Sequence, residues 1–291
     1  MALYDAHNHL QDERFGNRQA ELLELCRLEG VTAMVVNGSC EEDWPAVEDL
    51  ARNHPEVLPS FGYHPWYIGR RSPVWLERLR EQLDRIPSAV GEIGLDRWKP
   101  DLPYEGQEEV FLAQLRLAAD RNLPASIHCL RAWGRLYDLL RSHPRPACGF
   151  LLHSYGGPVE MVEPLARLGA YFSLPGYYAH ERKTRQREAF RRVPPDRLLI
   201  ETDAPDQLPP PERIRHALHE PVTGRPIHHP ANLPAVYAFA AELRGWSMET
   251  LIRRVEENFL RLFGHVWPAK LSSAIHRTTT EATANPKAPV T

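Results

Sequence analysis

Short hydrophobic runs alternate with longer amphipathic segments along most of the chain. The runs have the length and composition of buried strands, and there are eight of them: Leu3–His9, Val31–Asn37, Leu58–His64, Ser88–Leu95, Pro124–Cys129, Gly149–Ser154, Ala170–Leu174 and Leu198–Asp203. The segments between them repeat hydrophobic residues every three or four positions, which predicts helices over Gln19–Glu29, Glu42–Arg52, Val74–Arg85, Glu105–Arg121, Trp133–Arg141, Val159–Leu168 and Thr184–Arg192. This alternation predicts a single-domain (β/α)8 TIM barrel of the α/β class.

The chain beyond the last predicted strand has a different character. A Pro- and His-rich segment, Pro209–Pro230, precedes two further helical patterns, Leu233–Leu243 and Met248–Phe263. A connection of that length is usually a functional loop or disordered, and its place after the last strand favours a loop that shapes the substrate mouth. The end of the chain is rich in Ser, Thr, Ala and Pro without apolar periodicity. We therefore expect a barrel domain over residues 1–268 and a disordered tail over residues 269–291.

Length and charge narrow the functional classes. A chain of 291 residues suits one α/β barrel, and its hydrophobic fraction of 43% is ordinary for a globular protein. The formal net charge of −3 excludes a strongly basic protein. Any binding of nucleic acid would therefore rest on a local patch of charge and not on attraction by the whole molecule.

The number and spacing of the cysteines and the sequence of the N-terminal segment indicate the cellular compartment of the protein. The four cysteines show no Cys-x-x-Cys spacing and are too few for a disulfide framework, which favours reduced thiols in the cytosol. The N-terminus has no basic region followed by an apolar stretch, and no hydrophobic run reaches the length of a membrane span. We expect a cytoplasmic protein that does not bind membranes, and no obligate protein partner is indicated.

The first predicted strand ends in two alternating histidines. Side chains two positions apart on a strand share one face, so His7 and His9 are expected to point together into the mouth of the barrel. Asp5 has the same parity and would lie one layer deeper, where it can support the histidines. A single His-x-His on a solvated strand also occurs by chance, so the other strand ends decide its meaning.

Glu92 ends an otherwise apolar run and is flanked by Gly91 and Gly94, which let other groups approach the backbone closely. A buried carboxylate is costly unless a cation or a hydrogen-bond network compensates it. A structural salt bridge is one explanation. Beside further metal-binding side chains, a carboxylate that bridges two metal ions explains the position better.

Three later residues complete the candidate centre. His128 and His153 each end a strand; either alone would be read as a packed core histidine, but together they form a second imidazole pair. Asp203 supplies an anionic ligand that can also accept a proton from the attacking water. Imidazoles mixed with carboxylates suit Zn²⁺, Mn²⁺ or Fe²⁺ better than Ca²⁺, which prefers oxygen ligands throughout.

The motifs that contain these residues resemble those of one family. They are Asp5-Ala6-His7-Asn8-His9-Leu10, Gly62-Tyr63-His64-Pro65, Gly91-Glu92-Ile93-Gly94-Leu95-Asp96, Pro124-Ala125-Ser126-Ile127-His128, His153-Ser154-Tyr155-Gly156-Gly157, Glu201-Thr202-Asp203-Ala204-Pro205, Asn232-Leu233-Pro234 and Asn258-Phe259. In this order they resemble the TatD-type metal-dependent hydrolases, a deoxyribonuclease family among the amidohydrolase-like TIM barrels. The resemblance covers nearly the whole chain apart from the tail.

The resemblance implies two divalent metal ions, Mg²⁺, Mn²⁺ or Zn²⁺. One would be held by His7, His9, Glu92 and Asp203, and the other by Glu92, His128 and His153. Glu92 and Asp203 would then be the catalytic carboxylates.

The family is commonly described as metal-dependent deoxyribonucleases, often 3′→5′ exonucleases. That description implies DNA as the substrate, single-stranded or at a free end. The residues themselves leave two alternatives open. One is the hydrolysis of a small amide, lactone or phosphoester by the same centre. The other is a non-catalytic role in a larger assembly, against which the convergence of six metal-binding side chains argues.

Substrate-side residues are expected in the loops beyond the strands. His64 would bind a phosphate or stabilise a leaving group, or else pack under the turn that follows it. Trp66 is a candidate for base stacking. Arg131 follows His128 by three positions, where the family usually places an arginine after two. A basic cluster that begins at Arg182 and Lys183 can follow a phosphate backbone. A solvated helix face with Glu181 and Glu188 as partners is the alternative, and it explains the C-terminal half of the cluster better.

Overall fold

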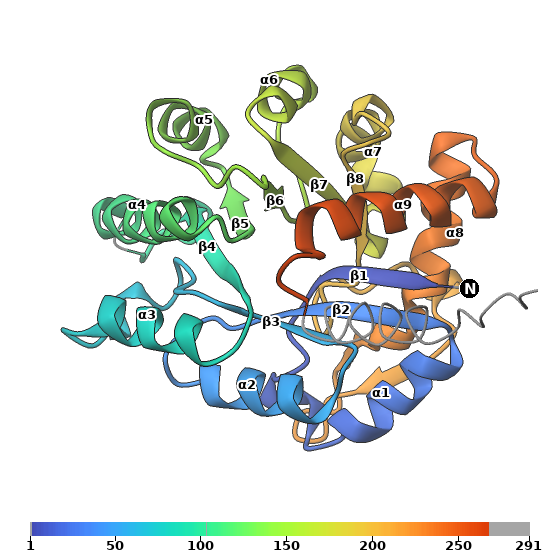
Figure 1. Cartoon of the computed structure of the whole chain (residues 1–291). Coiled ribbons are helices and arrows are strands. Elements are labelled where there is room, and N and C mark those ends of the chain that lie inside the picture. The colour runs from blue at the N-terminus through green and yellow to red at the C-terminus, as the bar shows by residue number, and fades with distance from the viewer. Residues whose placement is uncertain (1, 103, 268–291) are drawn as a thin grey trace, which may run out of the picture.

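The computed structural model describes residues 2–102 and 104–267, and Figure 1 shows its strands at the centre with helices outside them. One parallel sheet contains eight strands in chain order: β1 Leu3–Asn8, β2 Val31–Asn37, β3 Val57–Phe61, β4 Ala89–Asp96, β5 Ala125–Leu130, β6 Phe150–Leu152, β7 Ala170–Pro175 and β8 Leu198–Glu201. The connecting helices are α1 Gln19–Leu28, α2 Trp44–Asn53, α3 Trp75–Arg85, α4 Tyr104–Arg121, α5 Trp133–Ser142, α6 Val162–Arg167 and α7 Thr184–Arg192. The predicted (β/α)8 barrel is confirmed.

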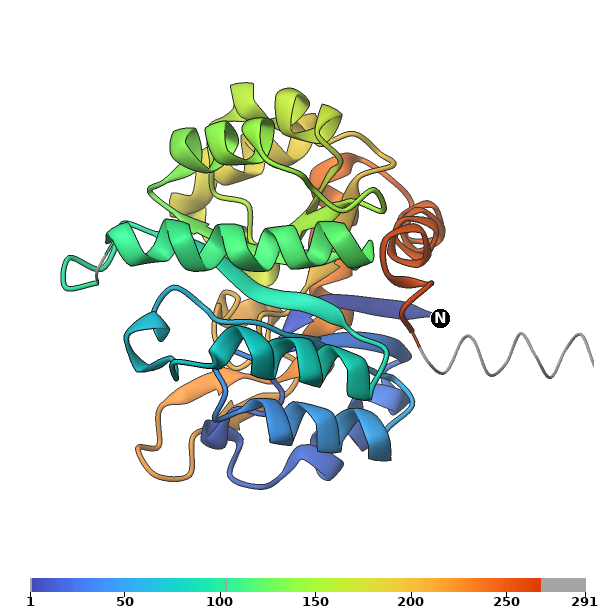
Figure 2. The ribbon, with the colours of Figure 1, turned by 60° about the vertical axis from the view of Figure 1, so that its left-hand side comes forward.

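The strands are buried on both faces, as expected for a parallel sheet covered by helices. Every residue of β4 and of β7 is buried, and the facing pairs Val35–Leu58 and Ile127–Leu152 show the parallel register. Outside the strands, α2, α3 and α4 lie roughly parallel to one another (Figure 2). This burial explains why the strands are continuous apolar runs in the sequence, and it leaves the loops after the strands to carry polar chemistry.

Several predicted strands extended past the real ends. β1 ends at Asn8, β3 at Phe61, β6 at Leu152 and β8 at Glu201. His9, His64, His153 and Asp203 therefore lie just beyond their strands. These residues belong to the first turn of each loop, where the chain leaves the sheet and its side chains can face the barrel axis.

Two helices follow the barrel proper, α8 Leu233–Arg244 and α9 Met248–Phe263. α9 covers the beginning of β1 and β8: the ring of Phe259 lies 4.9 Å from that of Tyr4, and the amide of Asn258 donates to the carbonyl of Leu198 at 2.9 Å. The Asn258-Phe259 motif thus closes the end of the barrel opposite the mouth.

The segment Pro209–Pro230, in which the sequence analysis expected a loop at the substrate mouth and no strands, has regular structure of its own. It contains an antiparallel hairpin, β9 Ala217–His219 and β10 Pro226–His228, whose Leu218 and Ile227 are buried. The hairpin is attached to the chain beyond β8, because the amide of His228 donates to the carbonyl of Pro205 at 2.8 Å. Short strands that pair only with each other, in a Pro-rich segment, leave little hydrophobic alternation to recognise.

The barrel closes where β1 meets β8. The amide of Asp203 donates to the carbonyl of His7 at 3.0 Å, and the amide of His9 donates to the carbonyl of Ala204 at 2.8 Å. Nearer the start of β1, the backbone groups of Tyr4 bond to a side chain of α8 instead of to β8. The buried hydroxyl of Tyr237 accepts from the amide of Tyr4 and donates to the carbonyl of Tyr4, both at 3.0 Å.

Replacing Tyr237 by phenylalanine is therefore expected to lower the free energy of unfolding by about 2 kcal/mol. The ring is kept, but a buried N–H and a buried C=O of Tyr4 lose their partner. Urea titration followed by circular dichroism measures the change, with Tyr137→Phe on the partly buried face of α5 as the control. An unchanged midpoint for Tyr237→Phe would show that these groups find other partners.

Within the described residues, no helix is both long and apolar enough to cross a membrane. The predicted disordered tail, residues 269–291, lies outside the residues that the structure describes.

Candidate metal centre

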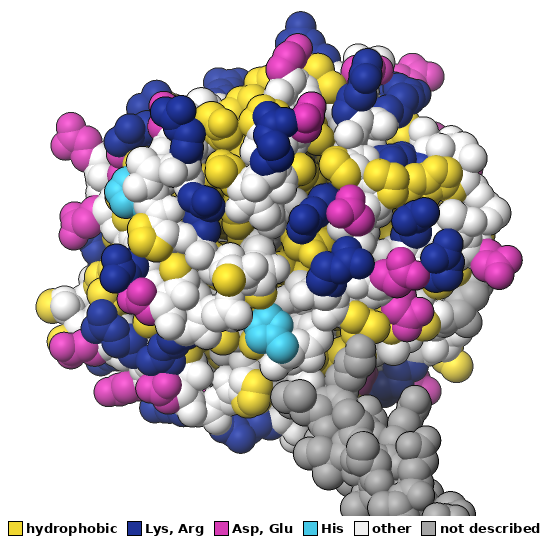
Figure 3. All heavy atoms as spheres, turned by 45° about the horizontal axis from the view of Figure 1, so that its top comes forward, with side chains coloured by type: hydrophobic (Ala, Val, Ile, Leu, Met, Phe, Trp, Pro, Cys, Tyr) yellow, Lys and Arg dark blue, Asp and Glu magenta, His cyan; other side chains and the backbone are white. Residues whose placement is uncertain are grey.

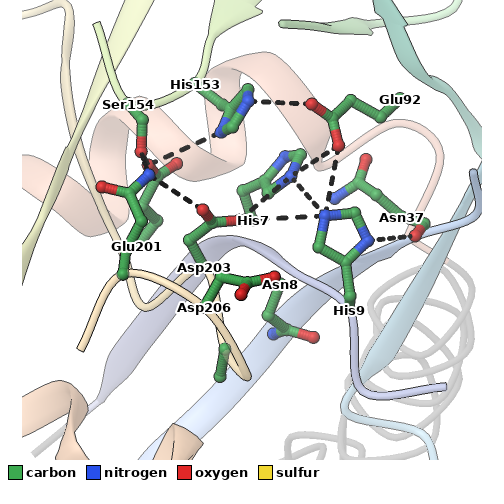
Figure 4. Close-up of polar contacts among 12 residues, drawn as sticks. His7, Asn8, His9, Asn37, Glu92, His153, Ser154, Glu201, Asp203 and Asp206 are labelled. Carbon is green, nitrogen blue, oxygen red and sulfur yellow. Dashed lines mark hydrogen bonds and ion pairs between the residues drawn. The ribbon is translucent and has the colours of Figure 1, made fainter. Parts of the chain in front are cut away.

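The structure brings together all six residues that the sequence analysis assigned to a metal centre. His7, Glu92 and His128 lie within β1, β4 and β5, whereas His9, His153 and Asp203 lie just beyond the ends of β1, β6 and β8; each is at least largely buried. Figure 4 shows one oxygen of Glu92 linked to His153 and the other linked to His7 and His9. The cluster therefore lies at the mouth formed by the carboxyl ends of the strands, where active sites of such barrels lie.

The two oxygens of Glu92 face two separate groups of imidazoles. Its Oε2 lies 3.4 Å from Nε2 of His7 and 3.1 Å from Nε2 of His9. Its Oε1 lies 2.8 Å from Nε2 of His153 and 3.0 Å from Nδ1 of His128. Asp203 joins the first group, with its Oδ1 3.7 Å from His7 and 3.8 Å from His9. One carboxylate thus connects two clusters of donor atoms.

Hydrogen bonds leave the inner nitrogens available as metal ligands. His9 donates from Nδ1 to the carbonyl of Asn37 at 2.8 Å, so its Nε2 keeps a lone pair. His128 donates from Nε2 to Oδ2 of Asp96 at 3.1 Å, which leaves Nδ1 free toward Glu92. His7 Nδ1 is 2.8 Å from the hydroxyl of Ser126. Metal-binding histidines are typically held by their outer nitrogen in this way.

The donor set fits divalent metal. Within the described residues, Oε1 of Glu92 is buried and accepts no hydrogen bond, although imidazole nitrogens surround it. A buried carboxylate oxygen without a hydrogen bond is costly unless a cation compensates it. Three groups of residues, His7–His9–Glu92, His7–His153–Asp203 and His64–Glu92–His128, each bring ligand atoms within 4.8 Å of one another.

Burial and the charges around Glu92 shift the pKa values of the cluster, in opposite directions for His7 and His9. Burial lowers the pKa of His7 well below its usual range. Burial opposes ionisation of Glu92 as well, but the imidazoles, His153 foremost, hold its pKa well below the usual value. At His9 the effect of burial is outweighed by Glu92 and Asp203, which raise the pKa to about 9. The carboxylate is therefore ionised, and a divalent cation would displace protons from the imidazoles that carry them.

Comparisons with known proteins show the family of the chain. The family described as "TatD related DNase" matches residues 4–264. The chain belongs to the TatD family. A protein of Pantoea vagans named "3'-5' ssDNA/RNA exonuclease TatD" is 31% identical over 266 residues, which are 90% of this chain and 99% of that protein.

A second relative of this TatD chain is the "Uncharacterized metal-dependent hydrolase YjjV" of Escherichia coli. It is 29% identical over 265 residues, 89% of this chain and 96% of the relative. The crystal structure of YjjV superposes with a TM-score of 0.81 at 28% identity and covers 90% of this chain and 98% of its own. The chain is thus a TatD-family metal-dependent hydrolase with the TIM-barrel fold of that family.

Glycines allow the TatD-family strand β4 to run close to its neighbours. A Cβ on Gly91 would lie 2.7 Å from Cβ of Ser126 and 2.8 Å from Oγ of Ser60. Gly94 has φ +149°, and a Cβ there would overlap the carbonyl group of His128. The expected close approach at these glycines is confirmed: β4 lies against Ser60 of β3 and against Ser126 and His128 of β5.

Asp5 holds the backbone beside two of the candidate ligands, His7 and Asp203. Its buried carboxylate accepts from the amide of Thr202 at 2.9 Å and from the hydroxyl of Thr202 at 2.5 Å, and it also accepts from the amide of His7 at 3.3 Å. Thr202 precedes Asp203, which has φ 54° in the left-handed region. Asp5 therefore fixes the turn that aims Asp203 at the histidines.

The three predicted substrate residues lie at different depths. His64 is buried inside the cluster, with Nε2 3.4 Å from Oε1 of Glu92, and its Nδ1 accepts from the amide of Trp66 at 3.2 Å. The indole of Trp66 donates to Oδ2 of Asp96 at 2.5 Å and borders the site. Arg131 is exposed after β5, and its guanidinium has no ion pair among the described residues. The structure does not bring it into the cluster.

Asp96, Glu201 and Gln207 contact the cluster but had no role in the sequence analysis. Asp96 holds both His128 and Trp66. Glu201 accepts from Ser154 and Ser173 and lies 3.8 Å from Nδ1 of His153. Gln207 donates to Oδ2 of Asp203 at 2.8 Å. The position of the two carboxylates along the chain could have identified them. Asp96 and Glu201 lie an even number of positions from Glu92 and Asp203 respectively, and residues spaced in this way share one face of a strand.

Proposed function

We propose that the protein is a two-metal phosphodiester hydrolase that degrades single-stranded DNA from a free 3′ end. The observation that carries the proposal is the division of donor atoms by Glu92, whose two oxygens face two imidazole groups. Each donor group would hold one divalent ion with Glu92 in common, and two ions would stabilise the charge on the attacking and leaving oxygens of a displacement at phosphorus. The exonuclease name of a relative at 31% identity supports the choice of substrate and end.

In this proposal His7, His9, Glu92 and Asp203 would hold one ion, and Glu92, His128 and His153 would hold the other. Bound Mg²⁺, Mn²⁺ or Zn²⁺ supplies Lewis acidity that stabilises charge developing on phosphoryl oxygens. The protein side chains do the remaining work.

Asp203 is the proposed proton acceptor. Its Oδ1 faces the cluster at 3.7 Å from His7, while its Oδ2 accepts from Gln207 at 2.8 Å and is thereby fixed. A carboxylate held by one oxygen can take the proton of the attacking water with the other. Asp96 keeps the ring of His128 in the orientation that presents Nδ1 to the centre.

The competing function is hydrolysis of a small amide, lactone or phosphoester, because the same centre serves either substrate.

The deciding experiment uses protein stripped of metal and then supplied with Mg²⁺, Mn²⁺ or Zn²⁺. Single-stranded DNA labelled at its 5′ end is the substrate, alongside the same strand with a blocked 3′ end. We expect cleavage only after metal is restored, a ladder that shortens from the 3′ end, and strong inhibition by the block.

Two results would overturn this proposal in different ways. Absence of cleavage by protein that holds two ions would reject the nuclease and favour the small-substrate hydrolase. Cleavage of the blocked strand at the same rate would keep the nuclease and reject attack from the 3′ end.

A further inference from the structure

Lysine is rare in this chain and its placement is uneven. Of the 35 basic residues, only Lys99, Lys183, Lys270 and Lys287 are lysines, and the rest are arginines. The first two are the lysines within the described residues, and both lie in loops at the mouth. Lys99 follows the end of β4 by three residues, and Lys183 lies in the connection from β7 to α7.

Lys99 is joined to the metal centre through one aromatic residue. Its exposed ammonium lies 3.4 Å from the centre of the Trp66 ring. The indole of Trp66 donates to Asp96, and Asp96 accepts from His128. The amide of Lys99 also donates to the carboxylate of Asp96 at 3.3 Å, so the same group positions the loop and the imidazole.

Lys183 has a matching arrangement on another side of the mouth. Its ammonium lies 4.5 Å from the ring centre of Tyr177 and 5.7 Å from that of Tyr178. The buried hydroxyl of Tyr178 donates to the carbonyl of Ser154 at 2.6 Å, and Ser154 adjoins His153. Each lysine is thus held beside the site by an aromatic ring, which attracts the charge without neutralising it.

Basic residues elsewhere are commonly neutralised by carboxylates. Arginines on the outer helices pair with acids one turn away, as Arg52 does with Glu48 and Arg116 with Asp120. Figure 3 shows basic and acidic side chains intermixed over one outer face. In the part of the chain that the structure describes, neither mouth lysine has such an ion pair. Their positive charge therefore remains available to an anionic substrate.

We propose that Lys99 and Lys183 each bind one backbone phosphate of a single-stranded nucleic acid whose scissile phosphate lies at the metal centre. A lysine ammonium is a compact point charge that binds phosphate without the fixed planar geometry of arginine. Trp98, beside Lys99, is 50% exposed and offers a face on which a base can stack. We call Lys99 and Lys183 together the rim. The inference rests on the proposed nuclease function and adds these two residues as the ones that hold the strand.

The test is the salt dependence of binding. The metal-loaded protein is titrated into a labelled thymidine strand about ten nucleotides long, a typical site size for a single strand, with phosphorothioate linkages to slow cleavage. Each phosphate contact contributes a slope of about 0.7 to the plot of log K against log salt. Lys99→Gln and Lys183→Gln are each expected to reduce the slope by about 0.7, and to weaken binding about fivefold at 0.1 M salt.

Two controls separate a phosphate contact from a general effect of charge. Lys99→Arg and Lys183→Arg keep the charge and should retain the wild-type slope. Arg116→Gln removes the same charge from the exposed side of α4, where Arg116 pairs with Asp120, and should leave the slope unchanged.

The outcomes distinguish this inference from the proposed function. If the strand is cleaved but either Lys→Gln variant keeps the wild-type slope, the two-lysine rim is wrong and the nuclease stands. If the wild-type protein neither binds nor cleaves the strand, the nuclease itself is rejected and the rim with it. A raised KM on the strand with kcat unchanged supports the rim, whereas a fall in kcat alone contradicts it.

Discussion

Glu92→Gln is expected to abolish hydrolysis and to lower the bound metal. Glutamine keeps the size of the side chain but has one acceptor oxygen and no charge. It therefore cannot act as an anionic ligand in both donor groups, the one beside Oε1 and the one beside Oε2. Loss of an outer partner of a ligand costs about 10–100-fold in metal affinity or activity. Loss of the shared carboxylate should exceed that range. Metal content by mass spectrometry and the initial rate of strand cleavage measure the two effects.

Glu56→Gln is the matched control for this variant. Glu56 is also a buried carboxylate, 7% exposed, but it pairs with Arg27 away from the centre. The Glu56→Gln protein should keep both its bound metal and its activity. Thermal unfolding would establish that Glu92→Gln retains the fold. A folded Glu92→Gln protein with two ions and a near-native rate would contradict a bridging role for this residue.

The barrel was predictable because its strands are buried on both faces. Such strands appear as short apolar runs, and the helices between them keep a periodicity of their own. The ends of the strands were not predictable to the residue. Asp203 and Ser154 have φ values of 54° and 44°, so the chain leaves the sheet sharply beside the centre. A hydropathy pattern does not record such a change of backbone direction.

Convergence of the six candidate ligands followed from topology, since the carboxyl ends of parallel strands share one mouth. The groups that orient them were harder to find. Asp96 bonds His128 across 32 positions of sequence, and Glu201 faces His153 from two strands away. Pairings of this kind depend on the stagger between strands, which the sequence pattern leaves open. The lysine rim likewise required the aromatic contacts of Lys99 and Lys183 to be seen.

Asp203→Asn should separate proton transfer from metal binding. Asparagine preserves the shape of the side chain and the left-handed turn, but it cannot accept the proton of the attacking water. Transfer of a proton by a positioned side chain contributes about 10²–10⁴-fold, so kcat should fall by at least about 100-fold while KM changes little. The second group of donors, Glu92 with His128 and His153, does not include Asp203. Metal bound there should persist, and metal content should fall by no more than one ion.

Asp206→Asn provides the comparison within the same turn. Asp206 lies three residues further on, is exposed and binds the partly buried Arg14 at 2.7 Å, so its loss removes a surface ion pair and leaves the centre intact. This variant should retain kcat, because surface pairs contribute little to stability and none of its atoms faces the imidazoles. Single-turnover cleavage of the same labelled strand compares the two variants directly. If Asp203→Asn stayed within tenfold of the wild-type kcat with both ions bound, another group would have to accept the proton.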